Sequence, residues 1–382
     1  MTPAARLSAA IGILDRILAG SPAEQTLTNW GRASRFAGSG DRNAVRDLVF
    51  DALRCRRSFA ALGGGETGRG LILGGLRSAG QDPESFFTGE GHAPAPLTLA
   101  DAGQTPEGYA AHDLPDWLGP RMEQDLGADF RALAEALRHR APVFLRVNTA
   151  RCALSDAQAA LAAEGIETVP HPLSPTALQV TGGARKVAGS AAYADGIVEL
   201  QDAASQAVVD ALPLADGQRV LDYCAGGGGK TLAMAARARL KLFAHDADPR
   251  RMRDLPARAK RAGARVTLTE APQGPFDLVL ADAPCSGSGS WRRAPEGKWL
   301  LTPDRLAGVI AVQAQILDRI ATLVAPGGVL AYATCSLLRA ENEAQIAAFQ
   351  ARSPGWSLAS QRRLTPLDGG DGFFVAVLRR DQ

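Results

Sequence analysis

The sequence is short of cysteine, and the spacing of the cysteines excludes two common roles for this residue. Five cysteines occur in 382 residues, at positions 55, 152, 224, 285 and 335, and no two of them form a CxxC pair. An odd number of widely separated cysteines argues against a disulfide framework, and the lack of CxxC pairs argues against a zinc site. We therefore expect a protein of a reducing, cytoplasmic compartment that holds no metal.

Long apolar runs and an excess of one charge are also missing. No apolar stretch approaches the roughly 20 residues that a membrane-spanning helix needs. Residues 1–20 place Asp15 and Arg16 among apolar side chains at helical spacing, which predicts an amphipathic helix and no signal peptide. The formal net charge is only +2, so binding to nucleic acid would have to depend on local clusters of cations.

The chain contains several successive patterns, as is typical of a protein with more than one domain. Residues 1–80 predict helices, and seven arginines against three aspartates between Arg32 and Arg57 indicate either a solvated helix face or a surface that faces RNA. Residues 81–113 are rich in proline and glycine and predict a linker. Residues 114–194 predict helices followed by a small α+β module, and residues 195–382 predict a doubly wound, Rossmann-like α/β domain.

A glycine-rich turn marks the expected cofactor site. A strand at 219–223 leads into this turn, and a helix follows it, so backbone N–H groups can approach a ligand closely. The next strand ends in Asp246, where a carboxylate can accept hydrogen bonds from the hydroxyls of a ribose. This pattern favours S-adenosylmethionine over NAD, and the alternative role of Asp246 is a helix N-cap. The turn itself consists of Cys224, Ala225, Gly226, Gly227, Gly228, Gly229 and Lys230.

Two cysteines follow the ends of two predicted strands. Asp282 and Cys285 come after the apolar strand at 276–280, and Cys335 follows the strand at 329–334. The carboxyl ends of parallel strands lie at one edge of a sheet, so we expect both thiols in one cleft beside the cofactor. A single cysteine is most often core packing, whereas a pair in this position favours a function. The cations that come next in the sequence suit an anionic, aromatic substrate.

Segments 220–231, 282–299 and 332–346 resemble the signature segments of the RNA 5-methylcytosine methyltransferases of the Sun/Nop type. The resemblance covers most of 114–382, and residues 1–80 resemble the NusB-type RNA-binding domain. It implies a monomeric enzyme that uses S-adenosylmethionine to methylate cytosine C5 in RNA, with rRNA favoured over tRNA as the substrate.

The resemblance also assigns roles to individual residues. Cys335 is the nucleophile that adds to C6 of the cytosine, because C5 alone is a poor nucleophile toward a methyl sulfonium, and Cys285 assists release of the product. Asp282 and Lys230 are placed against the base and beside the cofactor. Either Cys285 or water removes the C5 proton. The residues expected on the RNA are Arg146, Asn148, Arg292, Arg293 and Lys298.

Two other classes of protein remain as alternatives. One is an RNA-binding ribosome assembly factor that retains the cofactor fold without turnover. The presence of Cys285, Cys335, Asp282 and Lys230 argues against it. The other is a methyltransferase that acts on protein or on a small molecule, for which two cysteines at strand ends have no use.

Overall fold

The computed structural model describes residues 1–382 and divides the chain into two compact units. The first unit comprises Met1–Arg140 together with Trp291–Leu300, and the second comprises Ala141–Ser290 and Leu301–Gln382. These limits differ from the boundaries predicted from the sequence. The helices between 114 and 140 belong to the first unit, and so does the short segment that follows Cys285.

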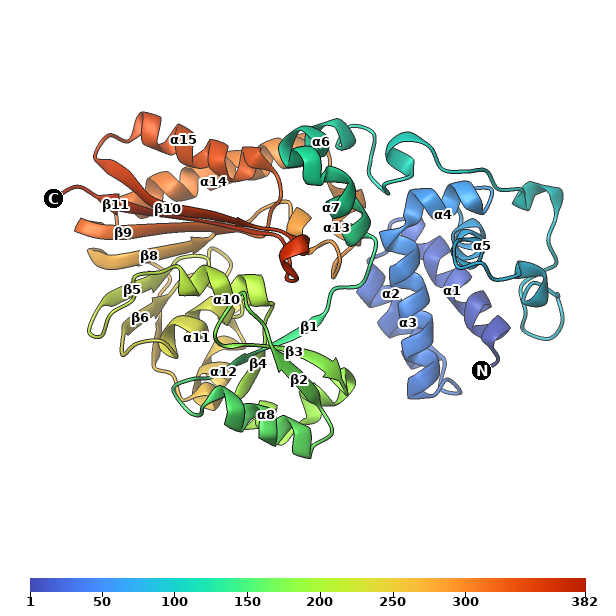
Figure 1. Cartoon of the computed structure of the whole chain (residues 1–382), viewed down its shortest axis with the longest axis horizontal. Helices are drawn as coiled ribbons and strands as arrows, with labels where there is room; N and C mark the ends of the chain where they lie inside the picture. Colours follow the sequence, from blue (N-terminus) through green and yellow to red (C-terminus); the bar gives the residue numbers. More distant parts are fainter. The chain divides into compact units, whose positions relative to one another are not determined.

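The first unit is helical and is built around one apolar core (Figure 1, blue to teal, with α13 in orange). Helix α1 buries Leu7, Ala10 and Leu14 at the three- and four-residue spacing of one helix face. The segment predicted as a linker lies against α5, where the Arg69 guanidinium pairs with the buried carboxylate of Asp101 at 2.8 Å. The helices are α1 (Pro3–Leu18), α2 (Ala23–Ala33), α3 (Ser39–Arg54), α4 (Arg56–Leu62), α5 (Gly68–Ser78), α6 (Gly119–Leu126), α7 (Phe130–Leu137) and α13 (Glu296–Leu300).

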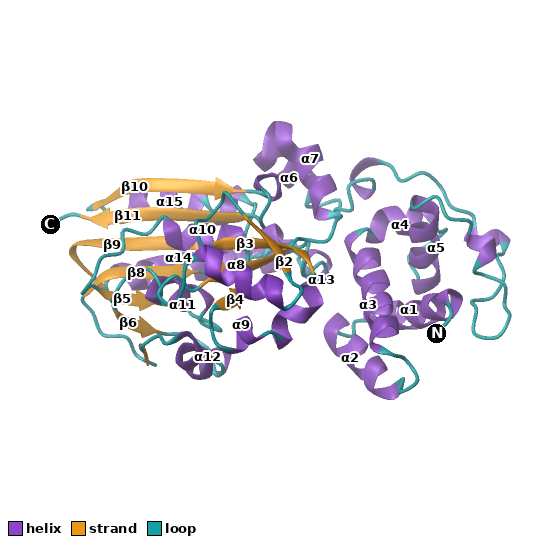
Figure 2. Cartoon of the chain, turned by 60° about the horizontal axis from the view of Figure 1, so that its bottom comes forward, coloured by secondary structure: helices purple, strands orange, loops and turns teal.

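The second unit contains two sheets (Figure 2). The smaller one has the order β2-β3-β1-β4 and antiparallel pairing, and its strands are β1 (Val143–Val147), β2 (Glu167–Pro170), β3 (Ala177–Gly182) and β4 (Val198–Leu200). Its core is closed by α8 (Leu154–Ala163) and α9 (Ala191–Ala194). This sheet is the small α+β module that the sequence predicts.

The larger sheet has seven strands in the order β10-β11-β9-β8-β5-β6-β7. The five strands from β9 to β7 are parallel, and β11 is antiparallel to both of its neighbours. The strands are β5 (Arg219–Asp222), β6 (Lys241–Ala244), β7 (Val266–Leu268), β8 (Phe276–Asp282), β9 (Val324–Thr334), β10 (Trp356–Leu364) and β11 (Phe373–Arg380). The predicted doubly wound α/β fold is therefore confirmed.

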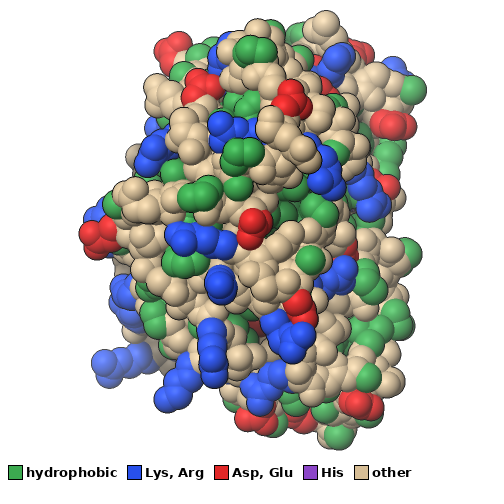
Figure 3. Space-filling model, turned by 90° about the vertical axis from the view of Figure 1, so that its left-hand side faces the viewer, with side chains coloured by type: hydrophobic (Ala, Val, Ile, Leu, Met, Phe, Trp, Pro, Cys, Tyr) green, Lys and Arg blue, Asp and Glu red, His purple; other side chains and the backbone are tan.

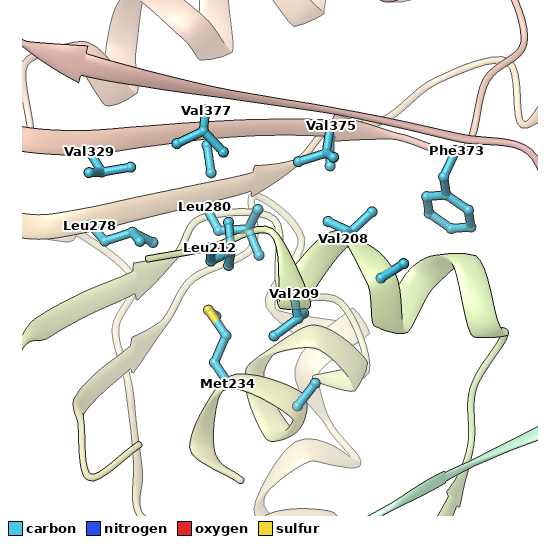
Figure 4. Close-up of a cluster of buried hydrophobic side chains, with 14 of the residues drawn as sticks. Val208, Val209, Leu212, Met234, Leu278, Leu280, Val329, Phe373, Val375 and Val377 are labelled. Carbon is cyan, nitrogen blue, oxygen red and sulfur yellow. The ribbon is translucent and has the colours of Figure 1, made fainter. Parts of the chain in front are cut away.

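Helices cover both faces of this sheet because successive side chains of each strand point to opposite faces. Leu278 and Leu280 of β8 pack with Val208 and Met234 of the helices on one face, as Figure 4 shows. Val279 lies in the core on the other face. The helices are α10 (Ala203–Asp210), α11 (Gly229–Ala235), α12 (Leu255–Ala262), α14 (Pro303–Ala321) and α15 (Glu343–Arg352). None of the helices combines the length and the hydrophobicity of a membrane-spanning segment.

Strand β5 lies where the strand order reverses. Its neighbours are β6, which follows it in the chain, and β8, which comes after the chain has crossed to the other side of β5. In open α/β sheets, ligands bind outside the carboxyl ends of the strands at such a reversal. Asp222 ends β5 and Asp282 ends β8 at this point.

Two cations of the segment Trp291–Leu300 are buried inside the first unit. Lys298 is 1% exposed, and its Nζ donates a hydrogen bond to the carbonyl of Arg54 at 3.0 Å. Arg292 is 9% exposed and donates to the carbonyls of His139 and Arg140. In these positions the two side chains hold the backbone of neighbouring helices, so the expectation that they contact RNA does not hold in this structure.

From the burial of Lys298 we predict how the unfolding free energy of the protein depends on pH. Burial lowers the pKa of its ammonium from 10.5 to about 8. The unfolded chain then binds more protons than the folded chain between these values, so the unfolding free energy rises as pH increases from about 8 toward 10.5. We expect Lys298→Met to remove this rise and to stabilise the protein at pH 7 by about 2 kcal/mol, after subtraction of the lost hydrogen bond.

Urea unfolding of both proteins at several pH values measures the difference. RNA affinity, measured in parallel, should stay unchanged in Lys298→Met. A variant that kept the alkaline rise in stability, or that lost RNA affinity, would contradict the structural role.

Candidate active site

The two cysteines predicted to converge lie side by side. Strands β8 and β9 are parallel neighbours with Asp282 opposite Ala333, so the loops after both strands leave the same edge. Sγ of Cys285 and Sγ of Cys335 are 3.3 Å apart, and both residues are half-buried. Gly289 brings the first loop back onto Cys335 by donating its N–H to the Cys335 carbonyl at 2.9 Å. A side chain at Gly289 would collide with the carbonyl of Gly372 at 2.1 Å.

The hydrogen bond between the two thiols shifts their pKa values in opposite directions. Hydrogen bonding from the Cys285 thiol lowers the pKa of Cys335. The same hydrogen bond, together with burial, raises the pKa of Cys285 well above its ordinary value. Cys335 is therefore the sulfur that becomes a thiolate, and Cys285 is the sulfur that keeps its proton.

An ion pair lies at the reversal point of the sheet beside these thiols. Nζ of Lys230, at the start of α11, donates to Oδ2 of Asp282 at 2.6 Å. Lys230 is buried and also lies 4.7 Å from the centre of the Phe373 ring. Its positive charge helps to lower the pKa of Cys335, while the charge of Asp282 acts in the opposite direction. The four predicted catalytic residues thus lie at one edge of the sheet.

A buried carboxylate that the sequence reasoning missed holds both cysteine loops. Glu341 is fully buried after β9, and its Oε1 accepts hydrogen bonds from the N–H of Ser286 at 2.7 Å and from Nε2 of Gln313 at 3.1 Å. Its Oε2 accepts from the hydroxyls of Ser286 and Ser336. Ser286 follows Cys285 and Ser336 follows Cys335, so one carboxylate fixes the backbone beside each sulfur. Asn342 adds a hydrogen bond from Nδ2 to the Ser336 carbonyl at 2.8 Å.

The glycine turn after β5 has the backbone that its sequence predicts. Gly226 and Gly228 have φ angles of 50° and 81°, which favour glycine. The N–H of Gly226 donates to Oδ2 of Asp246 at 2.9 Å, and Arg251 pairs with the same carboxylate at 3.2 Å. The acid at the end of β6 is therefore fixed against the turn, where we expect a nucleoside to bind.

The surroundings of the Asp222 carboxylate show whether this edge of the sheet fits a cofactor. Its Oδ2 accepts the Thr231 hydroxyl at 2.6 Å, whereas its Oδ1 is buried without a partner. Burial raises the pKa of this carboxyl to about 7. An unpartnered carboxylate oxygen next to a glycine turn fits a ligand with a cationic or N–H donor group. Burial also raises the pKa of Cys224, so the turn presents backbone atoms and a neutral thiol here.

Arg146 and Asn148 do not face solvent. Arg146 is 3% exposed and donates through Nη1 to the carbonyl of Gly229 at 2.6 Å. Nδ2 of Asn148 donates to the carbonyls of Gly196 and Ala262 at 3.1 and 2.9 Å. Both residues join the small sheet to the cofactor domain, so the predicted contact with RNA is corrected for them. Of the five residues expected on RNA, Arg293 has an exposed side chain.

Comparisons with known proteins agree with this arrangement. The family model described as 16S rRNA methyltransferase RsmB/F matches residues 209–379, and the model of the RsmF/B-like ferredoxin-like domain matches residues 114–186. Ribosomal RNA small subunit methyltransferase B of Salmonella arizonae is 33% identical over 328 residues, which are 81% of this chain and 73% of that protein.

Two solved structures share the fold. The methyltransferase homolog protein from Pyrococcus horikoshii is 26% identical with a TM-score of 0.63, over 71% of this chain and 97% of that one. PH0851 is 23% identical with a TM-score of 0.79, over 100% of this chain and 99% of that one.

The fold and the site thus define a methyltransferase that uses S-adenosylmethionine and acts on RNA. The chain belongs to the RsmB/F family of 16S rRNA methyltransferases.

The hydrogen bond between the sulfurs predicts how each thiol reacts. Cys285→Ala removes the donor that lowers the pKa of Cys335, so we expect alkylation of Cys335 by iodoacetamide at pH 7 to slow several-fold. Mass spectrometry of the Cys335 peptide after timed alkylation, over a series of pH values, gives the rate. An unchanged pH profile of Cys335 in the variant would show that Cys285 does not act on it.

The role of Glu341 predicts a difference between two substitutions. Glu341→Gln can keep the network, because its carbonyl can accept from Ser286 and Gln313 while its amide donates to the two serine hydroxyls. Glu341→Ala leaves these groups buried without partners and should lower the unfolding free energy by about 3 kcal/mol. We also expect it to reduce methyl transfer far more than cofactor affinity. Denaturant unfolding, calorimetry with cofactor and single-turnover assays of both variants test this, and equal behaviour of the two variants would exclude the proposed role.

Proposed function

We propose that this chain methylates C5 of a cytosine in rRNA through a covalent adduct between Cys335 and C6 of the base. The observation that carries this proposal is the pair of sulfur atoms 3.3 Å apart at the cofactor edge of the sheet. Methylation of an exocyclic nitrogen or of a ribose hydroxyl needs no nucleophilic thiol. Methylation of C5 does, since this carbon becomes nucleophilic only after a thiolate has added to C6.

The first half of the reaction activates the ring. The Cys335 thiolate forms a bond to C6, the π electrons of the C5–C6 bond move into the C4–C5 bond, and those of the C4–N3 double bond move onto N3, which makes C5 an enamine-like nucleophile. The charge that develops at the N3 edge is balanced by the neighbouring Lys230–Asp282 pair, which are 2.6 Å apart. Bound S-adenosylmethionine supplies the methyl group that C5 receives.

The second half releases the product. A base removes the C5 proton, the electrons of the C5–H bond restore the C5–C6 double bond, and the Cys335 thiolate leaves. A thiolate with a lower pKa is a better leaving group, and hydrogen bonding from Cys285 lowers the pKa of Cys335. This hydrogen bond explains how Cys285 assists release while keeping its own proton. The C5 proton is then taken by water.

Substrate access favours an unpaired cytosine. The target base must reach a half-buried sulfur at the edge of a sheet, which a base stacked in a duplex cannot do. Moving the base out of a stack costs the least free energy where the nucleotide is already single-stranded. We therefore expect a loop or a bulge of the rRNA to be the target.

Substitution of each cysteine tests the covalent reaction. Cys335→Ala should abolish methyl transfer and leave cofactor binding near normal, because it removes only the nucleophile. Cys285→Ala should instead slow departure of the Cys335 thiolate and accumulate an RNA–protein adduct. Methyl transfer is read by bisulfite sequencing of the rRNA, and the adduct by a band shift on a denaturing gel.

Cys152→Ala is the matched control, because Cys152 is a half-buried cysteine of the small module, outside the site. It should behave like the unaltered protein in both assays. Turnover by Cys335→Ala, or the lack of an adduct with Cys285→Ala, would be incompatible with this mechanism.

A further inference from the structure

Four of the five residues expected to bind RNA are buried, so the exposed cations lie elsewhere on the second unit. We propose that a cationic track formed by Lys241, Lys260 and Arg265 binds the phosphate backbone of the rRNA substrate. The proposal rests on membership of the rRNA methyltransferase family and is independent of which atom is methylated.

The three residues come together at the amino ends of two strands. Lys241 is the first residue of β6, Arg265 immediately precedes β7, and Lys260 lies in the last turn of α12. All three residues are exposed. Figure 3 looks onto the end of the molecule where β6 and its neighbours begin, and lysine and arginine side chains gather over its lower part.

The surface between these residues is hollowed. Two adjoining hollows of about 650 and 640 Å³ lie here, and Lys241 and Arg265 line both of them. Lys260 lines the second hollow as well. The one acidic residue that lines either hollow is Asp216, and Arg239 neutralises it at 2.5 Å. The net charge of the residues that line the two hollows is therefore positive.

The cations of the track have no carboxylate partner. Arg237 and Arg239, which lie nearby, are paired with Asp210 and Asp216, whereas Lys241, Lys260 and Arg265 form no ion pair. A solvated helix face usually alternates charges of both signs. Unpaired cations beside a hollow are the arrangement that neutralises phosphates and releases their counterions.

Helix α12 connects the catalytic edge of the sheet with the opposite edge, where the track lies. Residues 235–265 contain ten lysines and arginines against three aspartates, a net charge of +7, compared with +2 for the whole chain. Helix α12 crosses from the carboxyl end of β6 toward its amino end, about 12 Å for eight residues. RNA with its target cytosine at the cysteines can follow this helix to the track.

RNA is favoured over an anionic protein as the occupant. A protein partner would be expected to cover a contiguous apolar patch together with the charges. Leu268, at the end of β7, is the one large apolar side chain between 235 and 268 that is exposed. Leu240, Leu242, Phe243 and Val266 also line the hollows, but these side chains are buried or half-buried, whereas the three cations are exposed.

The experiment compares two triple variants with equal loss of charge. The track variant carries Lys241→Ala, Lys260→Ala and Arg265→Ala. The control carries Arg319→Ala, Arg362→Ala and Arg379→Ala, three exposed arginines of α14, β10 and β11. Filter binding to a 16S rRNA fragment, without cofactor, is measured over a series of KCl concentrations.

We expect the track variant to bind the rRNA fragment about 10- to 100-fold more weakly at low salt. The slope of log affinity against log salt should fall by about 2, since each phosphate contact in single-stranded RNA contributes about 0.7. The control should keep both values. Equal losses of affinity in both variants would mean that only the net charge of the protein matters, which would overturn the proposal. Unchanged binding by the track variant would overturn it as well.

Cofactor affinity, measured by calorimetry, verifies that the track variant is folded. Methylation of a short oligonucleotide that contains only the target loop should be unchanged in this variant, while methylation of the long fragment falls. Loss on the oligonucleotide as well would place the three cations at the catalytic centre and contradict a track remote from it. Because binding is measured without methylation, the result does not depend on the covalent mechanism.

Discussion

The site depends on the hydrogen bond between two sulfur atoms. This hydrogen bond requires Cys285 and Cys335 to stay 3.3 Å apart, although they lie on two loops that are separated by fifty residues of sequence. Two features of the fold provide this distance. Strands β8 and β9 are parallel neighbours, so both loops start at one edge, and the buried carboxylate of Glu341 then fixes the residue after each cysteine. The low pKa of one thiol is thus a property of the whole sheet edge.

The same edge gathers three carboxylates, of which Asp282 and Asp246 pair with Lys230 and Arg251 and Asp222 has no cationic partner. Asp222 and Asp282 end β5 and β8, Asp246 lies two residues beyond the end of β6, and Lys230 is the buried cation among them. The charges of Asp282 and Asp246 add to burial in raising the pKa of Asp222. A ligand that carries positive charge relieves this repulsion, and the sulfonium of S-adenosylmethionine is a cation. Cofactor binding and the electrostatics of the thiol pair are therefore linked through Lys230, which acts on both Asp222 and Cys335.

The sequence could predict those parts of the fold and the site that follow from local pattern. An apolar strand followed at once by a polar residue places that residue at a sheet edge, and this rule located Asp282, Cys285 and Cys335. It could not predict the burial of Lys298 or Arg292, because a cation between two tryptophans has the same sequence pattern whether it faces phosphate or a backbone carbonyl. Glu341 was missed for a similar reason, since a glutamate before a helix is ordinarily a solvated residue. Only the folded chain shows that two serines and a glutamine enclose it.

The buried Arg146 couples the small sheet to the cofactor turn. Arg146 of β1 donates to the carbonyl of Gly229, and Arg258 of α12 donates to the carbonyl of Gly227 while it pairs with Glu199 of β4 at 3.0 Å. The small sheet therefore holds the glycine turn from two sides, directly through the buried Arg146 and indirectly through the half-buried Arg258. Two carbonyls of the turn are satisfied by these arginines, so the turn keeps its shape without help from a ligand. A displacement of the small sheet would have to break the Arg146–Gly229 and Glu199–Arg258 contacts, which ties this module to the geometry of the cofactor turn.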